Sequence, residues 1–265
     1  GWKSNSVAHL AVWGARGALI LLLPTLLRGR VLPEGVPILR YGFMLFLGFL
    51  FGGWAAARRA DRAGVNGDLI WDLGMWIFFS GIIGARVFYI VQKHEDVFAG
   101  KQGIQWLIAA VNLPDGGLVL YGGVLLGIVA FIVFCKRHKL DALLMADIVV
   151  PSIFIGVAFG RIGCFLNGCC WGDRCDLPWA VQFPAGSVPF GTLVSRGFIP
   201  PDALATLPLH PTQLYSTLDA LVLAFLTARY FRVRPCNGAV LAVGWLLYPV
   251  TRFVMEFLRG DELGP

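Results

Sequence analysis

The sequence predicts an all-α protein, a polytopic bundle of about six or seven transmembrane helices with a small irregular cap on its outer face. Of its 265 residues, 57% are hydrophobic and 14% are charged, whereas a soluble domain typically carries about 45–50% apolar and about 25% charged residues. Mean hydropathy is +0.71. A soluble protein of this size lacks the core volume to bury so much apolar surface. An ordinary cytosolic enzyme, a disordered protein and a disulfide-rich secreted domain are therefore excluded.

Apolar runs long enough to cross a membrane recur along the chain, which we treat as one membrane domain over residues 1–265. A spanning helix needs about 20 mostly apolar residues. Arg16, Gly17 and Pro24 interrupt the first run, so that run can lie in the membrane interface instead. Residues 101–112 are expected to form an amphipathic interfacial helix. The candidate spans are 7–27, 37–57, 69–92, 118–135, 143–167, 210–231 and 239–258.

Basic residues in three short loops predict how the bundle is oriented. Loops rich in Lys and Arg stay on the cytoplasmic side, and the residues concerned are Arg58, Arg59 and Arg62, then Lys136, Arg137 and Lys139, then Arg229, Arg232 and Arg234. The basic residues that give the chain its net charge of +6 are therefore expected to orient it in the membrane. They do not form the basic stripe that is typical of nucleic-acid binding. The longer segments 93–117 and 168–209 are expected to face outward.

Segment 168–209 is predicted to form the cap. Its six prolines disfavour helix, and residues 179–183 are expected to form a short strand.

Several ionisable side chains interrupt the apolar runs. A charge within the hydrocarbon region costs at least about 2.5–3.5 kcal/mol, so such residues are functional candidates. They are Arg86, Asp147, Arg161, His210, Arg252, Glu256 and Arg259.

Arg252 and Glu256 are four residues apart, so on a helix they share a face and can pair. Arg259 extends the same stripe, which favours a polar cavity over a structural ion pair that merely lets the helix insert. Arg161 lies between Gly160 and Gly163, and its guanidinium can donate two parallel hydrogen bonds to the oxygens of a phosphate. The alternative for Arg161 is snorkelling to the interface.

Two further motifs offer polar groups near the outer face. Tyr121 is flanked by glycines, and the His210–Tyr215 segment carries His210, Gln213 and Tyr215 at the start of an apolar run. The alternatives are an interfacial aromatic belt and helix capping.

Four of the six cysteines gather within a short segment: Cys164, Cys169, Cys170 and Cys175. Such a group could hold zinc or an iron–sulfur cluster, but the spacing lacks paired C-x-x-C motifs. We favour disulfides, or free cysteines packed as small residues, over a metal. Cys135 and Cys236 stand apart.

Four blocks of this sequence resemble the phosphatidylglycerol–prolipoprotein diacylglyceryl transferase family. They are YGGVLLGI at 121–128, GRIGCFLNGCCWG at 160–172, HPTQLY at 210–215 and RFVMEFLRGD at 252–261. The resemblance covers about Tyr41 to Asp261, with the blocks in order.

The resemblance implies a multi-pass transferase of the bacterial inner membrane that acts in lipoprotein biogenesis. It would bind phosphatidylglycerol and move its diacylglyceryl group to the lipobox cysteine of a preprolipoprotein signal peptide, releasing glycerol phosphate. The cap would be periplasmic, and membrane lipids would surround the bundle. No cofactor, metal or nucleic acid is implied.

The resemblance also assigns roles by position. Arg161 would contact the lipid phosphate, Arg252 and Glu256 would form the essential pair, and Tyr121 would bind the phosphate or relay the thiol proton. The positions implied to bind substrate are Tyr41, Arg86, Asn167, Gly172, His210, Gln213, Tyr215 and Arg259.

Three positions depart from the family pattern. Tyr121 replaces a histidine, Cys164 an asparagine and Cys169 a glutamate. Tyrosine titrates well above neutral pH, so Tyr121 is a weaker base than the residue it replaces. These departures leave two alternatives: a catalytically altered relative that serves a larger membrane complex as a structural or lipid-binding subunit, and a thiol-redox or metal protein.

Overall fold

The computed structural model describes residues 40–98, 100, 105, 110 and 117–260. The predicted run at 7–27 lies outside these residues, as does the interfacial helix at 101–112 apart from two isolated positions.

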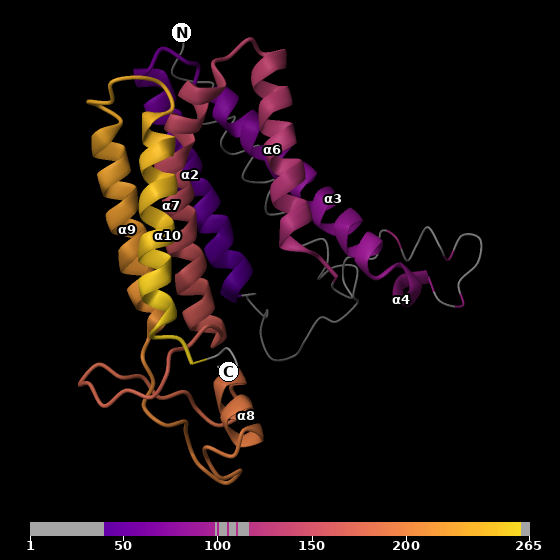
Figure 1. Cartoon of the computed structure of the whole chain (residues 1–265), viewed down its shortest axis with the longest axis vertical. Helices are drawn as coiled ribbons and strands as arrows, with labels where there is room; N and C mark the ends of the chain where they lie inside the picture. Colours follow the sequence, from indigo (N-terminus) through magenta and orange to yellow (C-terminus); the bar gives the residue numbers. More distant parts are fainter. Residues whose placement is uncertain (1–39, 99, 101–104, 106–109, 111–116, 261–265) are drawn as a thin grey trace, which may run out of the picture.

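The described residues contain six long helices, and each overlaps one of the six later apolar runs (Figure 1). The all-α prediction is confirmed. Five of the six, α2, α3, α6, α7 and α10, are long and apolar enough to cross a membrane, so the chain is a multi-pass membrane protein. The helices are α2 (Arg40–Arg62), α3 (Asp68–Gln92), α6 (Leu120–Arg137), α7 (Ala142–Asn167), α9 (Thr212–Tyr230) and α10 (Ala239–Glu256), with two short ones, α4 (His94–Phe98) and α8 (Val188–Ser195).

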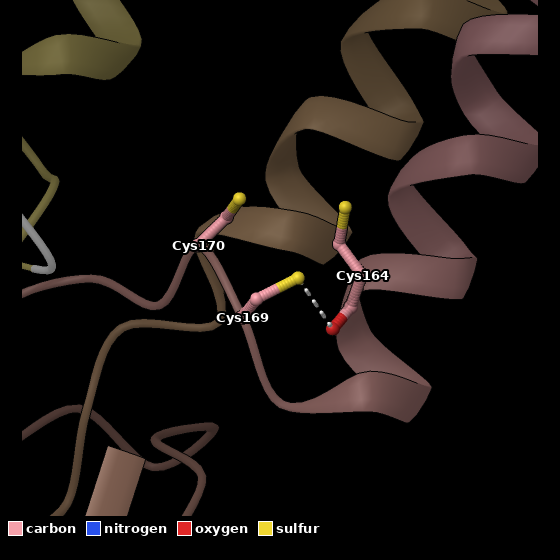
Figure 2. A group of neighbouring side chains, drawn as sticks. All are labelled: Cys164, Cys169 and Cys170. Carbon is pink, nitrogen blue, oxygen red and sulfur yellow. Dashed lines mark hydrogen bonds between the residues drawn. The ribbon is translucent and has the colours of Figure 1, made fainter. Parts of the chain in front are cut away.

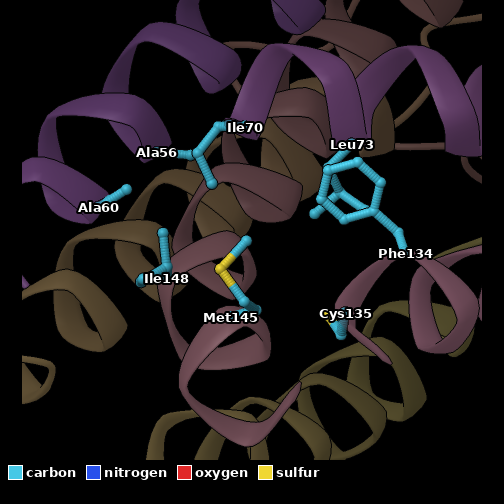
Figure 3. Close-up of a cluster of buried hydrophobic side chains, with 8 residues drawn as sticks. All are labelled: Ala56, Ala60, Ile70, Leu73, Phe134, Cys135, Met145 and Ile148. Atoms are coloured by element: carbon cyan, nitrogen blue, oxygen red, sulfur yellow. The ribbon is translucent and has the colours of Figure 1, made fainter. Parts of the chain in front are cut away.

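The long helices form two groups. Helix α7 lies beside α2, α9 and α10, whereas α3 packs chiefly against α6 and the two lean away together (Figure 1). A buried cluster joins the groups at the end where α2 and α6 finish and where α3 and α7 begin (Figure 3). Its members are Ala56, Ala60, Ile70, Leu73, Phe134, Cys135, Met145 and Ile148. The basic loops lie at this same end (Figure 1).

Arginines from the α2 end and the α9–α10 loop converge there, as the loop charges predict. Arg58, Arg59, Arg62, Arg232 and Arg234 line a cavity of ≈ 640 Å³. Arg59 is 9% exposed; it donates to the Ile148 carbonyl at 3.0 Å and to Ser152 Oγ. Arg59 thereby holds the end of α2 against α7.

Among the charged residues within the membrane-spanning helices, Asp147 has a structural role. The side chain is fully buried and accepts the backbone N–H groups of Gly238 and Leu241, each at 2.9 Å. Arg234 Nε lies 3.4 Å from the same carboxylate. Asp147 therefore satisfies the otherwise unpaired N-terminal donors of α10, and it ties that helix to α7.

Segment 168–209 lies beyond the ends of α7 and α9 and carries α8 (Figure 1). The strand predicted at 179–183 is wrong, because in the described residues Val181 forms only an isolated bridge with Leu209. The segment packs around its own small core of Trp171, Phe183, Phe190, Leu193, Ile199 and Leu209. Backbone hydrogen bonds between residues 181–185 and 204–209 form isolated bridges without making a regular strand.

Close contact between α3 and α6 depends on two glycines. A Cβ placed on Gly84 would lie 2.3 Å from the Gly122 carbonyl oxygen, and a Cβ on Gly122 would lie 2.3 Å from that of Gly84. The two backbones touch, as in membrane helix pairs whose interfaces are built from small residues.

Gly122→Ala is expected to destabilise the protein by about 1–3 kcal/mol, because the added methyl group must push the two backbones apart. Thermal unfolding in detergent measures the loss. Gly127→Ala in the same helix is the matched control, since its Cβ would meet Ile77 at an ordinary 3.7 Å. Equal unfolding midpoints for the two variants would contradict the tight contact.

Candidate functional site

The last turn of α7 ends in a backbone reversal that shapes the site. Gly168 has φ 71°, its N–H donates to the Phe165 carbonyl at 3.2 Å, and the Cys169 N–H donates to the Cys164 carbonyl at 3.1 Å. These bonds form a Schellman motif, in which the residue after the glycine folds back over the residue five positions earlier. The motif therefore places Cys169 against Cys164.

The first turn of α9 holds the loop that follows. Thr212 Oγ1 donates to the Cys170 carbonyl at 2.8 Å, and Gln213 Nε2 donates to the Cys169 carbonyl at 2.9 Å. Gln213 is fully buried, and its Oε1 has no partner in the described structure. Gln213 therefore positions the loop, and Thr212 is a supporting residue that the sequence analysis missed, although its place directly after a His-Pro pair marks a helix start.

His210 and Tyr215 form a small polar pair beside this turn. His210 Nδ1 lies 3.3 Å from the Tyr215 hydroxyl, which also accepts from Trp179 Nε1 at 2.7 Å. Trp179 belongs to the cap, and no feature of the sequence indicates that it reaches α9.

Gly172 joins three segments that are distant in the sequence. Its N–H donates to the His210 carbonyl at 2.9 Å, and the next residue, Asp173, donates to the Leu258 carbonyl at 3.0 Å. A Cβ on Gly172 would lie 2.5 Å from the His210 Cβ and 2.6 Å from the Leu258 oxygen. Only glycine fits where the end of α7, the start of α9 and the end of α10 meet.

Gly172→Ala is expected to lower the unfolding midpoint, with a cost of about 1–3 kcal/mol, because backbone as well as side chains must move. Circular dichroism during heating measures the change. Gly191→Ala in α8 is the control, since a Cβ there meets nothing within 4 Å. The junction would be disproved by a Gly172 variant as stable as the Gly191 variant.

The predicted pairing of Arg252 with Glu256 at the end of α10 is confirmed, and Arg259 lies just beyond the helix. Arg252 Nη1 forms an ion pair with Glu256 Oε2, and Arg259 Nη1 lies 3.6 Å from the same oxygen. Arg259 also forms an antiparallel bridge with Gly172. The three side chains carry two positive charges and one negative charge.

Arg161 lies half-buried on α7, two turns before the helix ends. Within the described part of the chain it has no hydrogen bond and no ion pair. Tyr41 packs against α7 close by, since a Cβ on Gly163 would lie 3.0 Å from the Tyr41 ring, and its hydroxyl is in electrostatic range of Arg161. An arginine in this setting is available to bind an anion.

Three further predicted site residues lie on α6, on α3 and at the end of α7. Tyr121 at the start of α6 is 73% exposed. Arg86 on α3 is 9% exposed and donates to the carbonyls of Ala110 at 2.9 Å and Gly117 at 3.1 Å. Asn167 is exposed at the end of α7. Arg86 thus anchors the chain before α6, and Tyr121 faces the surroundings of the helix pair.

No disulfide joins any of the six cysteines, all of which lie in the described part of the chain. Figure 2 shows Cys164, Cys169 and Cys170 gathered between the last turn of α7 and the loop after it, with their sulfur atoms within 4.8 Å of one another. Cys175 is apart, where its sulfur accepts the Leu177 N–H at 3.4 Å. The structure therefore shows none of the disulfides that the sequence analysis considered.

Comparison with known proteins agrees with this architecture. The family model for prolipoprotein diacylglyceryl transferase matches residues 31–264. Curated relatives carry the name phosphatidylglycerol–prolipoprotein diacylglyceryl transferase. The relative from Clostridium tetani is 33% identical over 87% of this chain and 84% of its own length, and that from Aeromonas salmonicida is 34% identical over 84% of this chain and 74% of its own.

A longer relative from Rhodopirellula baltica is 40% identical over 69% of this chain, and the match spans 38% of that protein. The family model covers every element of the junction, from Tyr41 on α2 to Arg259 after α10. The chain therefore belongs to the prolipoprotein diacylglyceryl transferase family.

Proposed function

We propose that the protein transfers the diacylglyceryl group of phosphatidylglycerol to the thiol of a lipobox cysteine in a preprolipoprotein, with release of glycerol phosphate. Arg161 carries this proposal, because it is an intramembrane cation with no hydrogen bond or ion pair to another described residue, a placement typical of a binding pathway. The names of the relatives supply the substrates.

The reaction needs a site that stabilises a departing phosphate. The thiol sulfur attacks the glyceryl carbon, the carbon–oxygen bond to phosphate breaks, and the electron pair stays on the phosphate oxygen. Fixed cations aimed at this developing charge, in a site that excludes water, are the most effective catalysts available. Arg161 and Arg252 take this role, and Glu256 holds Arg252 in place through their ion pair.

The remaining predicted residues are assigned to substrate binding. Those that can touch the substrate are Tyr41, Arg86, Asn167, His210, Tyr215 and Arg259, whereas Gly172 and the buried Gln213 act indirectly by holding the junction and the loop in place. Tyr121 hydrogen-bonds the phosphate or relays the thiol proton. Because Tyr121 is exposed at the start of α6, it is accessible to a lipid or peptide that arrives from the membrane.

The orientation follows from charge. The arginine-lined end is cytoplasmic by the positive-inside rule, so segment 168–209 is a periplasmic cap in the bacterial inner membrane. Phosphatidylglycerol and the signal peptide would then meet the site at the outer leaflet.

A purified system tests the function. The protein in detergent receives phosphatidylglycerol or phosphatidylcholine and a lipobox peptide, and mass spectrometry measures the thioether product. We expect product with phosphatidylglycerol only, and only with a cysteine in the peptide. Bound phosphatidylglycerol without product would refute the enzyme and favour a lipid-binding subunit.

A further inference from the structure

The group of Cys164, Cys169 and Cys170 has the composition and spacing of a metal site. Three sulfur atoms lie within 4.8 Å of one another, and a zinc ion with bonds of about 2.3 Å needs its sulfur ligands about 3.8 Å apart. Each cysteine side chain rotates about a single χ1 bond, so rotation can bring the sulfur atoms to this spacing. The spacing arises from the Schellman motif, which puts Cys169 against Cys164, and from the left-handed backbone of Cys170, with φ 61°.

The backbone that carries these ligands is fixed from a second helix. Thr212 and Gln213 on α9 hold the Cys170 and Cys169 carbonyls. Ligands held in this way keep their geometry in the absence of metal. Cys175 lies outside the group, and its sulfur already accepts a backbone N–H. It therefore serves as the comparison for the three proposed ligands.

Charge around the group favours a trithiolate complex. Zn²⁺ with three thiolates carries one net negative charge. Arg161 precedes Cys164 by three residues on α7, so the two side chains share a helix face, and both are in electrostatic range of Tyr41. The cation that would bind the lipid phosphate thus stands beside the proposed metal.

We propose that Cys164, Cys169 and Cys170 bind Zn²⁺ and leave its fourth position open for the thiol acceptor of the transfer reaction. Three protein ligands with an open position are typical of catalytic zinc. A thiol that coordinates zinc is deprotonated, and the thiolate is the nucleophilic form. The second part of this proposal rests on the proposed function.

The steps balance without an oxidant or reductant. When the acceptor thiol binds, its proton passes to solvent and a zinc–sulfur bond forms. The sulfur then attacks the glyceryl carbon, so a carbon–sulfur bond forms while the carbon–oxygen bond to phosphate breaks. The electron pair remains on the phosphate, which Arg161 faces. The thioether dissociates from zinc and restores the open position.

Zinc content tests the site independently of transfer. Purified protein is equilibrated with Zn²⁺, freed of excess metal and measured by inductively coupled plasma mass spectrometry. We expect about one Zn²⁺ per chain, and loss of that zinc in both Cys164→Ser and Cys169→Ala. Cys175→Ser and Cys236→Ser should retain it. Thermal unfolding confirms that each variant is folded.

Cobalt reports on the open position. Co²⁺ in place of zinc gives a thiolate charge-transfer absorption, which a lipobox peptide with cysteine should change and the serine peptide should not. In the transfer assay, loss of one ligand should lower the rate by about 10–100-fold, while Cys175→Ser leaves it unchanged.

Each outcome separates the two proposals. Wild-type protein that binds no more zinc than folded Cys164→Ser, or that contains a disulfide within the group, overturns the metal site. Full transfer by zinc-free protein overturns thiol activation and leaves the enzyme standing. Zinc bound through these cysteines without any transfer supports the site and overturns the proposed function.

Discussion

Arg161→Ala is expected to lower the rate of diacylglyceryl transfer by about 10²–10³-fold, the cost of removing one fixed donor to a developing negative charge. The fold should survive, because Arg161 holds no other described residue in place. Initial rates with phosphatidylglycerol and a lipobox peptide measure the effect.

Arg161→Lys separates charge from geometry. Lysine keeps the charge but not the planar fork that binds two phosphate oxygens, so its rate should lie between those of wild type and Arg161→Ala. Arg137→Ala is the matched control, since Arg137 is an exposed arginine at the opposite end of the bundle. If the Arg161→Ala and Arg137→Ala proteins transfer at equal rates, Arg161 is not the phosphate ligand.

Asp147→Ala is expected to cost about 3–5 kcal/mol of stability, because it leaves Arg234 and two backbone donors of α10 without their buried partner. The loss should appear as a large drop in the thermal unfolding midpoint in detergent. Because α10 also carries Arg252 and Glu256, activity at raised temperature should fall with it.

Asp147→Asn refines this test. The amide retains an acceptor for one N–H group but loses the charge opposite Arg234, so its midpoint should lie between those of wild type and Asp147→Ala. Asp141→Ala provides the comparison: Asp141 accepts the Leu143 and Leu144 N–H groups at the exposed start of α7, and its loss should be smaller. Equal midpoints for Asp147→Ala and Asp141→Ala would disprove the tie between α7 and α10.

The helices could be predicted because a membrane-spanning helix needs a continuous run of apolar residues, which is visible in the local sequence. Each apolar run after residue 37 became a helix, since a chain in lipid must satisfy its own backbone hydrogen bonds. The Arg252–Glu256 pair was equally predictable, because a spacing of four residues brings side chains together within one helix. The strand at 179–183 failed because its local pattern carried no information about a partner strand.

Contacts between distant segments were not predictable. Nothing near Gly172 indicates that His210 and Leu258 will close around it, and Asp147 looked like a site residue until its α10 partners were seen. The cysteine group is an intermediate case. Gly168 after an apolar run indicates a Schellman motif, and this motif brings Cys164 close to Cys169. A search for C-x-x-C motifs does not find this pair, because the two cysteines are five residues apart.

The central claim is that bond formation at a thiol and bond cleavage at a lipid phosphate are one event at this junction. The most direct test measures glycerol phosphate released and thioether formed in the same reaction, with peptides that carry cysteine or serine in the lipobox. The account predicts equal amounts of both products with cysteine and neither with serine. Release of glycerol phosphate without thioether, or no release by folded wild-type protein, would contradict it.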